Sequence, residues 1–304
     1  MNKILLVCFI MICAISALAQ DSPNPVDERK AYDALQNCSK EVDLNKKLAM
    51  AKEAIAAYPN SQYLPYFKQQ ILAARGGLFQ QAMQQNKPEE AFAIGSEVIA
   101  EDPENLNFLL TLADYGARLA KAKNYNFAGK STEYARKSVE LINNGKIPTG
   151  INEEQWAKSK NNVLATLHQS LGLYAMNANK EDEAVASFNE ALKHNCSDPY
   201  TYIQLSKIYN NRYQAAAEAY QKMSDEEKTS DAGKEALEKI NSAADQLIET
   251  YAKVIAFSEG NKSYDSARNQ IMPVLEGLYK FRHDGKTDGL REYIESMKAT
   301  CQQK

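Results

Sequence analysis

Three histidines come first among the residues that could do chemistry, because histidine is the side chain that most often transfers protons near neutral pH. His168 and His194 lie within one stretch of the chain, and His283 stands far from both. No two of them have metal-ligand spacing, and neither His-Glu-x-x-His nor Cys-x-x-Cys occurs. We therefore expect no metal site. His194 falls in the last turn of a predicted helix, where the helix dipole favours a cation.

Paired carboxylates are the second candidates, since a glycosidase works with two of them. The adjacent pairs Glu89-Glu90, Glu153-Glu154 and Glu226-Glu227 lie at predicted helix starts or in charged turns. Acids in a first helical turn interact favourably with the dipole, so capping explains these pairs without catalysis. The chain has no nucleophile elbow, no P-loop and no dinucleotide-binding glycine motif. The sequence predicts no cofactor.

Residues 1–19 have the pattern of a secretory signal: Lys3, an apolar run, and Ala17-Leu18-Ala19 before the expected cleavage site at Gln20. A single membrane anchor is the alternative, but the apolar run is shorter than the roughly 20 residues a span needs. We expect an exported protein, periplasmic or extracellular, with no transmembrane segment after cleavage. The 36 basic and 39 acidic residues form no basic block, which argues against a nucleic acid partner.

Cys38, Cys196 and Cys301 remain after the expected cleavage. An oxidising compartment permits a disulfide, and at least one of the three is expected to be a buried small hydrophobe. A link between Cys38 and Cys301 would require the two ends of the chain to meet. The sequence leaves the pairing open.

The elements that position these residues are predicted to be helices throughout. Ala, Lys, Glu, Gln and Leu dominate, and alternating β-branched runs bounded by turn residues are absent. The helices are expected in pairs, followed by two closing helices. The predicted ranges are 26–39 with 44–58, 63–85 with 89–100, 106–123 with 131–142, 153–178 with 181–194, 200–222 with 232–257, and then 264–282 and 288–301.

Similar helix ends recur along the chain. Pro59 and Pro103 each follow the second helix of a predicted pair, where proline stops a helix and turns the chain. Such a stop after successive helical hairpins is typical of a solenoid. Leu171-Gly172 followed by Ala184, Phe188 and Ala191 resembles the tetratricopeptide repeat, a helix-turn-helix unit of about 34 residues.

Two further segments resemble parts of the same repeat. Tyr202, Leu205, Ser206 and Tyr209 stand where the family places Trp, Leu, Gly and Tyr. In the segment from Pro88 to Pro103, the matching residues are Ala91, Val98 and Pro103, with Gly95 in place of the usual aromatic residue.

The resemblance implies an all-α fold, a right-handed superhelical solenoid of antiparallel helix pairs. This irregular array would span residues 20–260, with C-terminal capping helices at 261–304. His168 stands where the family places a large aromatic residue, which implies a packing role. The resemblance also implies a ligand groove lined by the first helix of each repeat. The candidate groove residues are Asp114, Arg118, Gln169, Leu173, Met176, Asn177, Tyr200, Ile203, Lys207, Asn210 and Asn211.

Two classes of function follow. The first is a non-enzymatic scaffold or adaptor of the bacterial envelope or secreted space, which holds a peptide, a protein segment or a partner helix. The second is an all-helical enzyme acting on a glycan or cell-wall polymer, which predicts a deep pocket with convergent carboxylates or a histidine. Homo-oligomerisation through the edge of the last repeat is a third alternative.

Overall fold

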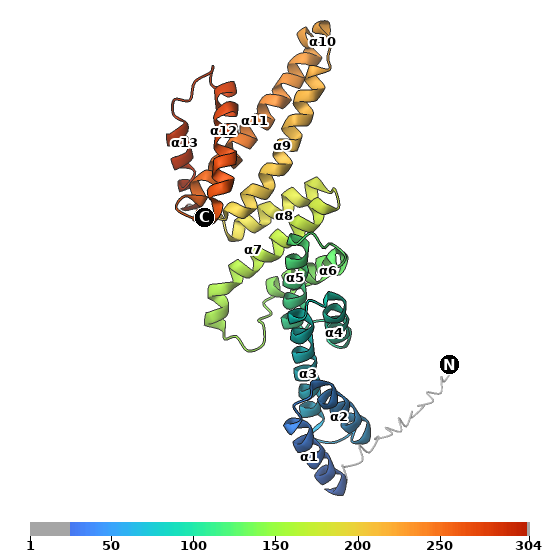
Figure 1. Ribbon diagram of the computed structural model, residues 1–304. Coiled ribbons are helices and arrows are strands. Elements are labelled where there is room, and N and C mark those ends of the chain that lie inside the picture. The colour runs from blue at the N-terminus through green and yellow to red at the C-terminus, as the bar shows by residue number, and fades with distance from the viewer. Residues whose placement is uncertain (1–24, 303–304) are drawn as a thin grey trace, which may run out of the picture. The chain divides into compact units, whose positions relative to one another are not determined.

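The computed structural model describes residues 25–302, so the predicted signal at 1–19 lies outside the described residues. The fold is all-α, as predicted, and residues 25–302 contain no strand (Figure 1). The chain forms two compact units that divide between Val98 and Ile99. The predicted helices are present, most of them with ends within one helical turn of the predicted ends.

The first unit begins with three helices that share a small core. They are α1 (Pro25–Lys40), α2 (Leu44–Ala57) and α3 (Leu64–Gln84). Ala31, Leu35, Ala54 and Phe67 form this core. Cys38 is fully buried, as expected for one of the cysteines, and burial raises the pKa of its thiol. The next helix, α4 (Pro88–Glu101), crosses the boundary between the units.

The second unit begins with two antiparallel pairs. These are α5 (Leu106–Lys121) with α6 (Ala128–Asn143), and α7 (Glu153–Asn177) with α8 (Glu181–His194). Helix α7 packs against its own partner α8 and also against both α5 and α6. Asn152 caps α7 in a capping box with Gln155, which fixes where that helix begins.

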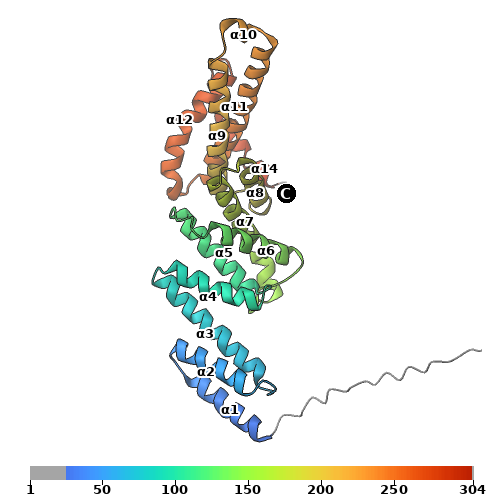
Figure 2. The same ribbon diagram turned by 90° about the vertical axis from the view of Figure 1, so that its right-hand side faces the viewer.

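Two long helices follow, α9 (Pro199–Gln221) and α11 (Asp231–Ser258), and they run side by side (Figure 1, Figure 2). The short helix α10 (Asp225–Thr229) joins their ends within a segment rich in charged residues. Ser224 and Ser230 cap α10 and α11 with their side chains. The largest hydrophobic core of this unit lies around α9 and α11, and includes Leu205, Ile208, Leu247 and Val254.

The chain ends in a 3₁₀ turn, η1 (Lys262–Tyr264), and the helices α12 (Asp265–Arg282), α13 (Leu290–Ser296) and α14 (Ala299–Gln302). The single helix predicted at 288–301 is wrong. Gly289 adopts φ +84° just before α13, and a turn at residues 297–298 separates α13 from α14. A disulfide joins Cys301 to Cys196, with the two Cα atoms 5.5 Å apart. It ties the end of the chain to the turn between α8 and α9.

Candidate functional site

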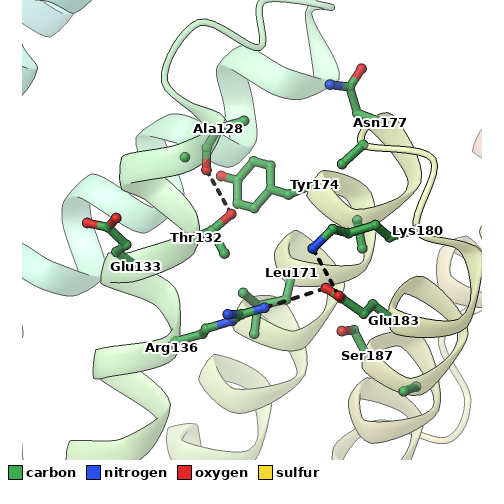
Figure 3. A pocket seen from close by; sticks show the side chains of 14 residues that line it. Ala128, Thr132, Glu133, Arg136, Leu171, Tyr174, Asn177, Lys180, Glu183 and Ser187 are labelled. Carbon is green, nitrogen blue, oxygen red and sulfur yellow. Dashed lines mark hydrogen bonds and ion pairs between the residues drawn. The ribbon is translucent and has the colours of Figure 1, made fainter.

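An open groove of about 530 Å³ lies between α6 and α8, over the C-terminal part of α7 (Figure 3). The side chains of Leu171 and Tyr174 project into it from α7. Its other apolar contributions are small: Ala128 and Gly129 from α6, Ala175 and Ala178 from the end of α7, and Ala186 from α8. Small side chains leave room near the backbone, so the groove can accept side chains from outside.

Three charged residues meet at this groove. Glu183 Oε1 accepts a hydrogen bond from Lys180 Nζ at 3.0 Å, and Glu183 Oε2 lies 3.6 Å from Arg136 Nη2 (Figure 3). Arg136 belongs to α6 and Glu183 to the first turn of α8, so the second contact spans the groove. All three side chains are about half exposed or more, so each pair contributes little to stability.

Tyr174 lines the groove but is itself buried, with 5% of its surface exposed. Its hydroxyl donates to the carbonyl oxygen of Ala113 at 3.5 Å. Burial raises the pKa of Tyr174 to about 12. The phenol therefore stays protonated at neutral pH and cannot serve there as a general base.

A second cleft, of about 540 Å³, lies between the end of α8, α9 and α11. Glu249 and Lys253 of α11 form an ion pair at 2.5 Å, and Lys253 Nζ lies 5.6 Å from the ring centre of Tyr202. The Tyr202 hydroxyl donates to the carbonyl oxygen of Cys196 at 3.0 Å, and burial raises its pKa to about 12. Thr300 of α14 also lines this cleft, beside the disulfide.

Several candidate groove residues from the sequence make contacts within the protein. Asp114 pairs with Arg118 on the same helix at 3.1 Å. Gln169 donates to Asp198 Oδ2 at 2.8 Å and to Thr201 Oγ1 at 2.9 Å, which links α7 to the start of α9. The half-buried apolar candidates Leu173, Met176 and Ile203 pack against the core around α9 and α11.

The remaining candidates lie in two places. Asn177 lines the groove between α6 and α8. Tyr200, Lys207, Asn210 and Asn211 lie on α9, where Lys207 Nζ donates to Gln204 at 3.0 Å and Asn211 is exposed. The half-buried ring of Tyr200 lies under Lys121 Nζ of α5, which is 5.1 Å from the ring centre.

The histidines lie in two separate contacts. His168 and His194 stack on each other, and His283 stacks on Tyr279 with ring centres 3.9 Å apart. Within residues 25–302, no cluster of three or more His, Cys, Asp or Glu side chains is placed to hold a metal ion. Across the same residues, every helix is too short or too polar to span a membrane.

Sequence reasoning missed the contact between Arg136 and Glu183. The spacing of Lys180 and Glu183 is a local signal for a helical ion pair. Arg136 lies on another helix and pairs with Glu183 only through tertiary packing, so no sequence pattern links them.

A scan against protein-family models finds no match to the chain, and a search of curated proteins finds no significant similarity.

Proposed function

We propose that this protein is a non-enzymatic binding protein, an irregular solenoid of tetratricopeptide-like helix pairs that holds a segment of a partner protein. One observation carries the proposal: the first two pairs of the second unit are built alike. A Cβ added to Gly116 of α5 would lie 1.9 Å from Ser131 Oγ of α6, and one added to Gly172 of α7 would lie 2.5 Å from Phe188 of α8. Each glycine therefore lets its helix approach its partner closely.

The buried faces of the two second helices follow the same spacing. On α6 the buried face consists of Ser131, Ala135 and Ser138, all fully buried. On α8 it consists of Ala184, Phe188 and Ala191, of which only Ala191 has any exposure, 1%. Both sets are four and then three residues apart, which is one face of a helix. Helix α7 touches the pair before it and its own partner, as stacking of such units requires.

Open grooves between neighbouring helices favour binding over catalysis. Arg136, Lys180 and Glu183 interact with one another at one groove, and Glu249 pairs with Lys253 at the other. The carboxylates of Glu183 and Glu249 are therefore each held in an ion pair. An open surface of mixed polarity suits a segment of polypeptide.

The disulfide supports export. Cys196 and Cys301 are 105 residues apart in sequence, and such structural disulfides persist in oxidising compartments. Together with the signal predicted at 1–19, this leads us to propose a periplasmic or extracellular location for the protein.

A site-specific photo-crosslinking experiment tests the proposal. The crosslinking amino acid replaces Ala186 in the α6–α8 groove, Asn211 on α9, or, as a control, Ala219, an exposed α9 residue outside both grooves. A binding protein gives a discrete adduct at Ala186 or Asn211 that unlabelled protein competes away, and none at Ala219. An adduct with the mass of two chains would identify a second copy as the partner. The enzyme would be supported instead if no adduct formed and if the wild-type protein cleaved a glycan while the Glu249→Gln variant did not.

A further inference from the structure

The guanidinium of Arg136 is only partly engaged at the α6–α8 groove. It extends from α6 toward α8 (Figure 3), and its side chain is 66% exposed. Among the described residues its ionic contact is Glu183 Oε2 at 3.6 Å, which is too long for a hydrogen bond. Arginine carries five N–H donors in a planar fork that matches the two oxygens of a carboxylate. The fork is therefore open to an acceptor from outside.

A second cation, Lys180, contacts the same carboxylate as Arg136. Lys180 lies across the groove and gives one of its three donors to Glu183. Helix α8 begins at Glu181 with no side-chain cap, and its first turn favours an anion. Arg212 pairs with both Glu181 and Asp182, at 3.5 and 2.7 Å, and so balances one of the two negative charges of these acids.

Glu183 occupies the position that an outside carboxylate would take. It lies between Arg136 and Lys180, whereas Glu133, which also lines the groove, points its carboxylate away from them (Figure 3). Exposed ion pairs of this kind are worth about 0–1 kcal/mol, so a ligand can compete with Glu183 for the two cations. Beside this charged point lie the apolar side chains of Leu171 and Tyr174.

We infer that this groove binds an acidic segment of a partner polypeptide. An Asp or Glu side chain of the partner accepts two hydrogen bonds from Arg136 and one from Lys180, and its apolar neighbour packs on Leu171 beside the exposed edge of Tyr174. The inference rests on the proposed function, because it specifies the chemistry of the protein segment that is held. A basic segment would meet the two cations at the same point and be repelled.

An array of random-sequence peptides, probed with the full exported chain, tests the inference. We expect wild type to select peptides in which Asp or Glu stands beside a large apolar residue. Arg136→Ala should weaken binding of the selected peptides about tenfold, because a charge-assisted hydrogen-bonded pair is lost. Glu183→Gln should strengthen it severalfold, because the internal competitor for Arg136 is removed. Arg291→Ala, an exposed arginine that pairs within α13, is the matched control and should change nothing.

Opposite effects of Arg136→Ala and Glu183→Gln exclude simple structural damage, which would weaken binding in both variants. Peptide binding that ignores acidic residues, prefers basic ones, or survives Arg136→Ala undiminished overturns the inference but leaves a protein-binding function in place. If no peptide binds and no adduct forms at Ala186, the proposed binding function fails at this groove as well. The same two variants should lower and raise the yield of the Ala186 adduct.

Discussion

The imidazole rings of His168 and His194 lie nearly parallel, with centroids 5.9 Å apart and planes 10° apart. His168 belongs to α7 and His194 to the last turn of α8, so the stacked rings join the two helices of one pair. Burial lowers the pKa of His168 below 6.5, the charge of His194 lowers it further, and Glu190 raises it. The folded protein therefore favours the neutral ring of His168.

This contact predicts a loss of stability in mild acid. The unfolded chain protonates His168 near its ordinary pKa of about 6.5, whereas the folded chain does so only at lower pH. The free energy of unfolding should therefore fall as the pH drops below about 6.5, and no such loss should occur above it. Urea denaturation at neutral pH and at about pH 5 measures the difference, before most carboxylates titrate.

His168→Gln should reduce this pH dependence, and His283→Gln, at an exposed position away from the stack, should preserve it. If His168→Gln retains the full loss between neutral pH and about pH 5, another group is responsible.

Gly172 should not tolerate a side chain. A methyl group there would lie within 2.7 Å of three ring atoms of Phe188, which is fully buried and cannot move aside easily. Gly172→Ala should lower the free energy of unfolding by about 1–3 kcal/mol. Gly277→Ala is the matched control, since Gly277 lies inside α12 with no atom within 4 Å of an added Cβ. It should raise stability by roughly 0.5–1 kcal/mol, because alanine is the better helix former. Equal effects at the two glycines would contradict this account.

The helices were largely predictable from sequence because their ends are set by local chemistry. Helix α8 begins at Glu181 and ends at His194, as predicted from first-turn acids and last-turn bases. The predicted helix at 288–301 was wrong because left-handed Gly289 delays its start to Leu290 and a turn at residues 297–298 divides it. The pairing of Cys301 with Cys196 depends on tertiary approach over 105 residues. The local sequence pattern contains no information on whether these two cysteines come close together in the fold.

The site was less predictable than the fold. The family resemblance directed attention to the first helices of the pairs, whereas the groove with Arg136 and Glu183 lies between second helices. A usable signal existed in α6, because Ser131, Ala135 and Ser138 have the spacing of the better-matched helix α8. This spacing was not recognised in the sequence, because Ser131 and Ser138 stand where apolar residues would be expected. The burial of Ser131 follows from close packing against Gly116 of α5, which only tertiary structure reveals.

Arg282 and Asp245 should contribute measurably to the packing of α12 on α11. Arg282 Nε donates to Asp245 Oδ1 at 2.6 Å, and Nη2 donates to Oδ2 at 2.9 Å. Lysine cannot reproduce this two-bond geometry, so Arg282→Lys should cost about 1 kcal/mol of unfolding free energy. High salt should diminish the difference, because both side chains are partly exposed. Arg291→Lys, at a highly exposed pair within α13, should have almost no effect, and a similar cost there would contradict the assignment.

Removing the disulfide should destabilise the second unit more than any single substitution above. The bond closes a loop across a sequence separation of 105 residues, so its loss increases the conformational entropy of the unfolded chain. The combined variant Cys196→Ser and Cys301→Ser should lose about 2–5 kcal/mol in the free energy of unfolding, as should reduced wild type.

Alkylation followed by mass spectrometry checks the bond itself in protein lacking residues 1–19. Cys38, fully buried, should react only after unfolding, and Cys196 and Cys301 only after reduction. Three reactive thiols in unreduced, unfolded exported protein would show that the bond does not form and would remove the structural support for export.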